Sequence, residues 1–386
     1  VTLEKFKKDF PEMLASNSGL FAKMLLNVDI PLNTAWREKE YKNELRGAKG
    51  NLLVSMTKEA NSAVLELAAP KQEDSAMHTM LSLGDFIEER LFSMILEETI
   101  PNVFIASTER TGATTFRKQL NLATSNLIDL LSQAHKDGER SLTPHKVFQT
   151  IYGKQEYAQP VKDNVRFINQ LPDSNVEFGE LYKESPNLLK RFESIVGGTY
   201  ATNKEGLTYF QPKGTSLKLG LGEVSSSVRS LLIIWYWLKH EAKKGDMLIM
   251  DEPELNLHPS NQRRLARFLA ALVNHGLKVF ITTHSDYIVK EFNTLIMLNQ
   301  ELPYFENIRE KYKEYLPEDR LEATKVALYM TREELILRDG AKRKTKTKTL
   351  IKADISPTLG IEAQSFDDTI NEMNAIQEAI YYGMDS

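Results

Sequence analysis

Met-Leu-Ile-Met-Asp-Glu-Pro-Glu, at residues 247–254, is the stretch of sequence that decides the fold. Its four large apolar residues in succession predict a strand buried in a parallel sheet. Asp251, Glu252 and a proline follow where that strand has to end. Because open α/β sheets place their ligand-binding groups at the carboxyl ends of their strands, the two carboxylates are candidate site residues. An apolar run followed by Asp-Glu also arises by chance, so the flanking sequence has to support this interpretation.

Upstream, three serines at Ser225, Ser226 and Ser227 precede a long apolar run at residues 231–238. Hydroxyl residues before an apolar run are a signal for the start of a helix. Since the run is apolar on nearly every side, we expect this helix to be buried. A serine cluster at a helix N-terminus suits phosphate binding, and a simple helix cap is the alternative.

Downstream, residues 277–283 predict a second strand, and His284 follows it directly. A helix is predicted between the two strands, from Pro259 to about Val273. A histidine in this place is able to donate a hydrogen bond to a phosphate, although a histidine taken alone more often has a structural role. The order of helix, strand, helix and strand predicts an α/β fold with a parallel sheet.

Three motifs in this region resemble those of the ABC-type ATPases, and in particular of the branch that includes the OLD and SMC proteins. Residues 223–230, Glu-Val-Ser-Ser-Ser-Val-Arg-Ser, are similar to the signature motif of that branch. Residues 251–259, Asp-Glu-Pro-Glu-Leu-Asn-Leu-His-Pro, resemble its Walker B motif and D-loop, and Thr-Thr-His-Ser-Asp at 282–286 resembles its switch-histidine segment. The resemblance is dense over about residues 195–300. It implies an α/β ATPase head, with a parallel-rich sheet flanked by helices and an inserted helical subdomain.

The resemblance also implies cofactors and roles. In such ATPases two heads meet as a head-to-head dimer and sandwich ATP and Mg²⁺. Within one head, the resemblance implies that Asp251 holds the metal, Glu252 acts as the general base and His284 contacts the γ-phosphate. Toward the partner head, it implies that Ser225, Ser226 and Ser227 contact the partner's ATP. Asn256, Leu257 and His258 would form the D-loop, which acts in trans. His258 stands where the family has an aspartate, which leaves that trans contact open.

Bacterial members of this branch, such as those of the PARIS, Septu and OLD-type systems, serve in anti-phage defence together with an effector. The resemblance therefore implies an ATP hydrolase that controls a protein effector, such as a nuclease or toxin. Two alternatives remain open, namely an SMC-like ATPase that binds DNA in repair and a degenerate ATPase that acts as a scaffold. A nuclease activity of the chain itself is not expected, because no clustered Glu and Asp-x-Asp pattern of the Toprim type is found.

The phosphate-binding P-loop of the family, Gly-x-x-x-x-Gly-Lys-[Ser/Thr], does not occur in this sequence. Gly-Lys appears only at Gly153-Lys154, where it is followed by Gln. Either a segment that carries the P-loop precedes Val1, or the protein is a degenerate ATPase. We favour the first explanation, because the later motifs are intact.

Composition narrows the class of protein. The chain has 386 residues and no cysteine, which excludes disulfides, thiolate metal sites and a cysteine nucleophile. No apolar run is long enough to span a membrane, so we expect a cytoplasmic protein without membrane contact. Its net charge of −4 gives no overall preference for nucleic acid, so binding to nucleic acid would need a local basic patch.

We expect four segments along the chain: 1–114 as the N-terminal part of the head, 115–195 as the helical insertion, 196–300 as the part of the head with the three motifs, and 301–386 as an α/β extension. The first is expected to hold helices at 3–14 and 83–96 and a hairpin from strands 51–56 and 62–68. A buried strand at 102–107 follows them. Arg110 comes just after that strand, where it would either face the nucleotide or form a surface salt bridge. Short strands near 197–200, 206–211 and 216–219 lead back to the serine-capped helix.

The extension contains a basic alternation, Lys342-Arg-Lys-Thr-Lys-Thr-Lys348, between strand-like runs at 325–330 and 350–355. The alternation predicts lysines on one face, where they would either meet a phosphate backbone or stay solvated at a hairpin tip. Residues 365–382 predict an amphipathic helix. Its apolar stripe is expected in the core or in a dimer contact.

Overall fold

The structure is a computed structural model of the chain. It describes residues 10–11, 13–21, 37–46, 52–62, 64–68, 100–115, 157–169, 171, 177–203, 207–337, 343–362 and 364–384. The chain divides into two compact units, residues 1–8 with 17–103, and residues 9–16 with 104–386. The helices expected at 3–14 and 83–96, and most of the insertion expected at 115–195, lie wholly or largely outside the described residues.

The first unit contains a three-stranded antiparallel sheet and the short 3-10 helix η1 (Ser18–Phe21). Strand β2 (Leu52–Lys58) pairs with β3 (Glu66–Ala68), which confirms the predicted hairpin. Asn61 in their connection has a φ of 60°, a left-handed conformation that asparagine tolerates well. The sheet also includes β1 (Tyr41–Arg46), which pairs with β2 and was not predicted because its sequence is polar.

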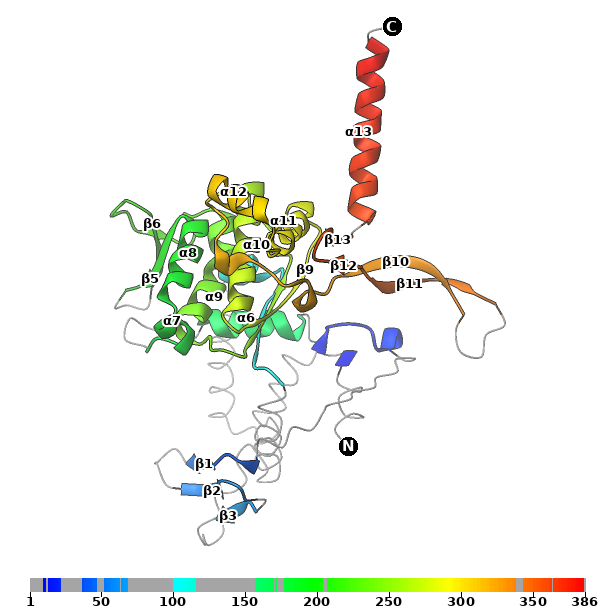
Figure 1. Cartoon of the computed structure of the whole chain (residues 1–386). Coiled ribbons are helices and arrows are strands. Elements are labelled where there is room, and N and C mark those ends of the chain that lie inside the picture. Colours follow the sequence, from blue (N-terminus) through cyan, green and yellow to red (C-terminus); the bar gives the residue numbers. More distant parts are fainter. Residues whose placement is uncertain are drawn as a thin grey trace, which may run out of the picture. The chain divides into compact units, whose positions relative to one another are not determined.

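The second unit is built on a three-stranded sheet in the order β4, β8, β9; Figure 1 labels its strand β9 beside helix α10. Strand β8 (Met247–Asp251) is the predicted strand, and Leu248 and Met250 in it are fully buried. It pairs in parallel with β9 (Lys278–Thr282), so that Asp251 lies opposite Thr282 at the carboxyl ends of both strands. Strand β4 (Val103–Ala106) confirms the strand expected at 102–107, although Val103 at its start is exposed.

Helix α9 (Ser226–His240) is the central helix of this unit. It begins after Ser225, as the serine cluster predicts, and every residue from Leu231 to Leu238 is buried. It packs against α3 (Arg110–Thr115), as well as against α6, α7 and α8. The all-round apolar sequence therefore makes α9 the core of the unit.

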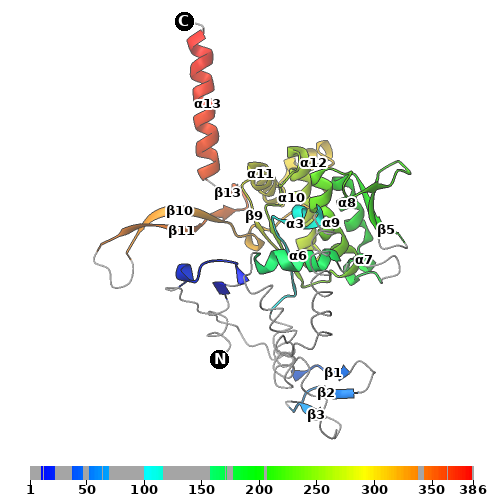
Figure 2. The same cartoon turned by 180° about the vertical axis from the view of Figure 1, so that it is seen from behind.

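Three helices and three strands precede α9 in the chain. They are α6 (Gln159–Asn169), α7 (Glu180–Glu184), α8 (Pro186–Val196), β5 (Gly198–Thr202), β6 (Thr208–Pro212) and β7 (Leu219–Gly220). The strands form an antiparallel sheet in the predicted positions. The helices lie in the segment expected as the end of the insertion, and their apolar residues belong to the same core as α9 (Figure 2).

Beyond β8, α10 (Pro259–Asn274) contacts β9, and α11 (Asp286–Met297) packs on α10. The predicted helix at 259–273 is thereby confirmed. Smaller elements complete this side: α12 (Pro303–Lys311), the 3-10 helices η3 (Pro317–Asp319) and η4 (Ala323–Lys325), and the strand pair β12 (Ile355–Ser356) with β13 (Gly360–Ile361). Of these elements, η4, β12 and β13 share a second apolar cluster with α10 and α11.

The C-terminal extension differs from expectation in two ways. Strands β10 (Tyr329–Ile336) and β11 (Thr345–Lys352) pair as an antiparallel ribbon, so Lys346 and Lys348 lie within a strand and not at a hairpin tip. Helix α13 (Gln364–Met384) confirms the predicted C-terminal helix, but its apolar stripe is exposed and belongs to no core in the described structure. No described helix has the length and apolar character needed to cross a membrane.

Candidate functional site

Asp251 lies half-buried at the carboxyl end of β8, where hydroxyl groups from two other strand ends reach it. Thr108, which follows β4, donates a hydrogen bond of 2.8 Å to Oδ2 of Asp251. Thr282, at the end of β9, donates to Oδ1. Three segments far apart in the sequence thus converge on one carboxylate, as expected where parallel strands end together. The two threonines were not predicted, because single hydroxyls at strand ends carry no distinctive signal.

Arg110, at the start of α3, is fully buried behind this carboxylate. Its guanidinium donates to the main-chain carbonyls of Asp251 (2.6 Å), Glu252 (2.9 Å), Ser107 (2.9 Å) and Ser230 (3.1 Å). Burial lowers the pKa of Arg110 to about 10, and the surrounding carboxylates oppose that shift, so the guanidinium stays charged at neutral pH. Neither the expected exposure to a nucleotide nor the surface salt bridge matches this position. Arg110 instead ties β8 to α9 as a structural support.

Asn164 on α6 supports the end of β4 in a similar way and is also buried. Its Oδ1 accepts hydrogen bonds of 2.9 Å from both the N–H and the hydroxyl of Ser107. Its Nδ2 donates to the carbonyl of Ile105. A lone asparagine in an amphipathic helix gives no signal in the sequence, so this support was also missed.

Glu252 has a φ of 45°, in the left-handed region that non-glycine residues seldom adopt. Two hydrogen bonds hold it there, from its own N–H to the carbonyl of Thr282 (3.1 Å) and from Arg110 to its carbonyl (2.9 Å). Within the part of the chain that the structure describes, its carboxylate accepts no hydrogen bond. The main chain of Glu252 is therefore fixed, while its carboxylate is free to act on a ligand.

Glu254 joins the Walker B segment to the segment with His284. Its Oε2 accepts a hydrogen bond of 2.8 Å from the Thr283 hydroxyl, and its Oε1 accepts one of 2.7 Å from the His284 N–H. The His284 side chain is exposed, and no described residue bonds its imidazole. Glu254 was not among the predicted site residues, although it belongs to the Asp-Glu-Pro-Glu motif. It places His284 beside the carboxylates by holding its main chain.

The predicted D-loop follows Glu254. Asn256 is exposed with a φ of 62°, whereas Leu257 is buried. His258 caps α10 through its Nδ1, which accepts from the N–H of Ser260 (3.3 Å). Gln262, in the first turn of α10, donates to the Leu257 carbonyl (2.9 Å) and accepts from the Ser285 hydroxyl (2.6 Å). The D-loop and the switch segment are thus coupled through Gln262, and the capping role explains a histidine at position 258.

The serine cluster lies at the N-terminus of α9. Ser225 caps the helix, and its hydroxyl lies 2.7 Å from that of Ser227. Ser226 accepts from Arg229 (3.2 Å), which also donates to the Val224 carbonyl (2.6 Å) and so fixes the turn before the helix. The hydroxyls therefore stand together at the positive end of a helix dipole, as the sequence predicts.

A family profile described as "AAA ATPase domain" matches residues 4–289, which is more than half of the chain. The chain belongs to this ATPase family. The match extends well upstream of the motif-rich stretch at 195–300. It covers both units, and it ends before the ribbon and α13.

The search of the curated proteins found no match. Among solved structures, the chain is similar to one titled "Structural biochemistry of ATP-driven dimerization and DNA stimulated activation of SMC ATPases", with 13% identity, a TM-score of 0.26, and coverage of 50% of this chain and 92% of that one. It is also similar to the Smc head domain from Pyrococcus furiosus, bound to the C-terminal domain of ScpA, with 17% identity, a TM-score of 0.21, and 48% of each chain covered.

The residues at the end of β8 fit the magnesium site of an ATPase. Among the described residues no group of three or more His, Asp or Glu side chains forms a complete metal site. Mg²⁺ in nucleotide sites needs no such group, because it binds one or two carboxylates together with phosphate oxygens and water. Asp251, flanked by the hydroxyls of Thr108 and Thr282, supplies oxygen ligands of this kind.

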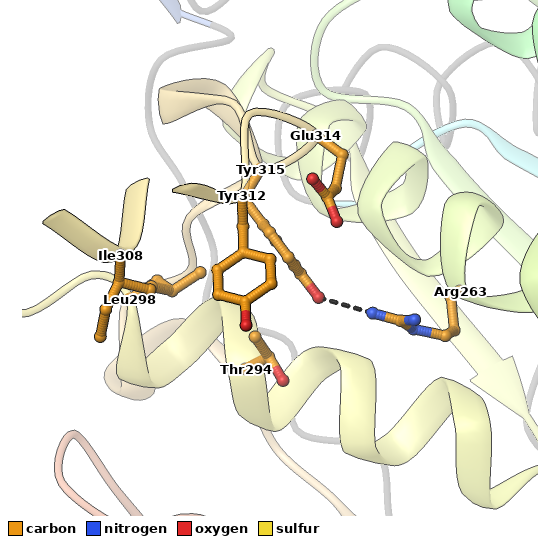
Figure 3. Close-up of a pocket in the computed structure, with 7 residues that line it drawn as sticks. All are labelled: Arg263, Thr294, Leu298, Ile308, Tyr312, Glu314 and Tyr315. Atoms are coloured by element: carbon orange, nitrogen blue, oxygen red, sulfur yellow. Dashed lines mark hydrogen bonds between the residues drawn. The ribbon is translucent and has the colours of Figure 1, made fainter. Parts of the chain in front are cut away.

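A pocket of about 320 Å³ lies elsewhere in the ATPase, beside α10, α11 and α12 (Figure 3). Arg263 on its wall donates to the hydroxyl of Tyr315 (2.8 Å) and pairs with the buried Glu291 (2.6 Å). None of the predicted site residues lines this pocket. Because the pocket is lined by none of these residues, we assign it no part in the nucleotide site.

Proposed function

We propose that this AAA-family protein is an ATP hydrolase of the ABC type, whose two heads sandwich ATP and whose nucleotide state controls a partner effector, in bacterial anti-phage defence. The observation that carries the proposal is the carboxylate edge of β8 and β9. There Asp251 is held by two hydroxyls, Glu252 is free, and Glu254 positions His284. The family match supports the nucleotide as the ligand.

In the proposed mechanism each residue has a task that its surroundings suit. Asp251 would hold Mg²⁺ through lone pairs that Thr108 and Thr282 leave open, and a bound Mg²⁺ would supply neutralisation of charge on the ATP phosphates. Glu252 orients a water and takes its proton, because its carboxylate is not used within the described chain. His284 donates to the γ-phosphate from a main chain that Glu254 fixes in place.

The proposed dimer rests on side chains of the α9 N-terminus and of the D-loop, which lie outside the carboxylate edge of β8 and β9. Ser225, Ser226 and Ser227 stand at the start of α9 and would contact ATP bound to the partner head, where the helix dipole favours a phosphate. Asn256 would contribute from the D-loop, beside His258, whose ring nitrogen already caps α10. The effector and the defence role rest on the resemblance of the three motifs, and pulldown of a specific protein effector from the native host would test them.

Replacing Glu252 by glutamine tests the catalytic centre. In a form of the protein that hydrolyses ATP, Glu252→Gln should lower turnover by a factor of about 10² or more, because it removes the base and keeps the shape. ATP binding should persist, and light scattering should show an ATP-bound pair that stays together. Asp251→Asn should instead weaken both hydrolysis and the ATP-bound pair, because it removes the metal ligand.

Glu301→Gln serves as the matched control, because Glu301 is exposed and far along the chain from these motifs. Its turnover should equal that of the wild type. Hydrolysis at the wild-type rate by Glu252→Gln would show that the Asp-Glu pair is not the catalytic centre.

A further inference from the structure

The ribbon formed by β10 and β11 has one face that is exposed along its whole length. Directly opposite residues share a face in an antiparallel pair. The pairs on this face are Tyr329 with Lys352, Thr331 with Leu350, Glu333 with Lys348, and Leu335 with Lys346. We call these eight residues the lysine face. All eight are exposed, whereas Met330, Ile336 and Ile351 on the opposite face are half-buried.

The lysine face combines apolar surface with positive charge. Tyr329, Leu335 and Leu350 are 57%, 64% and 64% exposed. Three lysines oppose a single glutamate, and although Lys346 pairs with Glu333 at 2.5 Å, the face keeps a net positive charge. A two-stranded ribbon without a covered face is marginally stable in water. The side chains therefore favour a partner that is both apolar and acidic.

Helix α13 has this character. Met373, Ile376, Ile380 and Tyr381 are 55–72% exposed and follow the spacing that places them on one side of a helix. At about 100° per residue, Glu372 flanks this stripe next to Ile376, and Glu378 flanks it on the other side, beyond Tyr381. The sequence of α13 contains four acidic residues and no lysine or arginine. Two copies of α13 would repel each other, so this stripe favours a basic partner.

The two elements that carry these surfaces are similar in length. A helix of 21 residues is about 31 Å long, and eight residues of a strand extend about 26 Å. Among the described residues of one chain no element covers either surface, so both are available to a second copy. Each copy of the chain carries both a lysine face and an α13. A reciprocal exchange therefore gives two identical contacts around a two-fold axis.

We propose that α13 of one copy docks on the lysine face of a second copy, so that the C-terminal extensions hold two chains together. Both surfaces lie outside the segment that the ATPase family profile matches. This contact does not involve the nucleotide, and it is measured without nucleotide so that it is separate from the sandwiching of ATP.

Charge exchange in the full chain tests the contact. The first variant carries Lys346→Glu and Lys348→Glu, and the second carries Glu372→Lys and Glu378→Lys. Each variant alone should form dimers at least tenfold more weakly than the wild type in sedimentation without nucleotide, because like charges then face each other. An equimolar mixture of the two should recover dimers, because the reversed ribbon of one chain then meets the reversed helix of the other.

Matched controls change charge on the opposite sides of the same elements. Arg332→Glu lies on the other face of β10, and Ala375→Lys lies across α13 from the stripe. Both should dimerise like the wild type, and circular dichroism should show that all variants are folded. A wild type that stays monomeric, single variants that dimerise normally, or a mixture that fails to recover dimers would each overturn the proposal. Loss of binding to a DNA duplex on reversal of the ribbon lysines would also overturn it.

Discussion

Two sets of side chains meet at the carboxyl ends of β8 and β9, and they differ in how they are bonded. Behind the strand ends, Arg110 donates to four main-chain carbonyls, and Asn164 bonds both the N–H and the hydroxyl of Ser107. In front of them, the Glu252 carboxylate and the His284 imidazole have no hydrogen bond to any described residue. Asp251 and Glu254 lie between these sets, because they accept bonds from the strand ends while facing the front.

In the proposed function, the bonded side chains behind the strand ends support the main chain, and the unbonded side chains in front take part in the reaction. Groups that are buried and fully bonded fix the main chain, and their loss leaves polar atoms without partners. Groups that are free contribute little to folding and are available to a ligand. A site built in this way holds its reactive groups in place before the ligand arrives. Substitutions behind the strand ends should therefore lower stability, whereas substitutions in front should lower activity alone.

The largest effect is expected for Arg110→Met. Methionine keeps most of the volume but leaves the carbonyls of Ser107, Ser230, Asp251 and Glu252 without their donor. We expect the free energy of unfolding to fall by about 3–5 kcal/mol, as for other buried charged networks that lose one partner. Urea denaturation followed by circular dichroism measures this change.

Arg166→Met is the matched control, because Arg166 is exposed on α6 and, among the described residues, pairs only with Asp163. Its unfolding should change by less than about 0.5 kcal/mol. If Arg110→Met unfolded at the same urea concentration as the wild type, the supporting role would be wrong and a direct contact with the nucleotide would regain weight.

Replacing Ser226 by a large residue tests a side chain that is proposed to contact a ligand and not to support the fold. Ser226→Phe should leave the stability nearly unchanged, because Ser226 is half-exposed in the first turn of α9. It should leave ATP binding to one head intact but prevent the second head from approaching, so that turnover falls by about 10². ATP titration and light scattering measure the two steps separately, with Ser216→Phe as the exposed control. Normal pairing of the Ser226 variant would remove the serines from the proposed interface.

Glu254→Gln should give an intermediate result, because Glu254 belongs to both sets. The amide of glutamine has one accepting oxygen, so it cannot accept from both the Thr283 hydroxyl and the His284 N–H in the same way. We expect a loss of about 1 kcal/mol in unfolding free energy and a turnover about tenfold lower. Both are measured on one preparation. An effect on turnover without any effect on unfolding would place Glu254 with the free groups.

The sequence predicted where the residues in front of the strand ends lie in the fold, but it did not predict the supports behind them. Asp251, Glu252, His284 and the serine cluster follow from strand ends and helix caps, which leave periodic and local patterns. In the sequence Arg110 stands out only as a charge after a strand, and three of its four carbonyl partners lie more than a hundred residues away. A bond to a main-chain atom leaves no trace in the residue type of its partner, so such supports are visible only in three dimensions.

The same limit applies to the C-terminal extension. Alternation correctly predicted that Lys346 and Lys348 share a face, because the period of a strand is local. Where the strands begin and end was not predicted well, since polar residues such as Thr345 and Thr347 form most of the pairing. The stripe of α13 was expected in a core or a dimer contact. Periodicity predicts an apolar side but not what covers it, and no described residue buries the stripe from Met373 to Tyr381.

The smallest effect is expected for the ribbon lysines on DNA. The chain has a net charge of −4, and Lys346 is already paired with Glu333 on the same face. A phosphate backbone would have to displace that glutamate, and counterion release from so few lysines adds little affinity. Lys346→Glu with Lys348→Glu should therefore bind a labelled DNA duplex as the wild type does, with an unchanged dependence on salt. Fluorescence anisotropy at several salt concentrations measures both, with Lys213→Glu and Lys243→Glu as exposed controls. A clear loss of affinity and a flatter salt dependence in the ribbon variant alone would make the lysine face a DNA contact, and would favour the repair ATPase over the effector-controlling one.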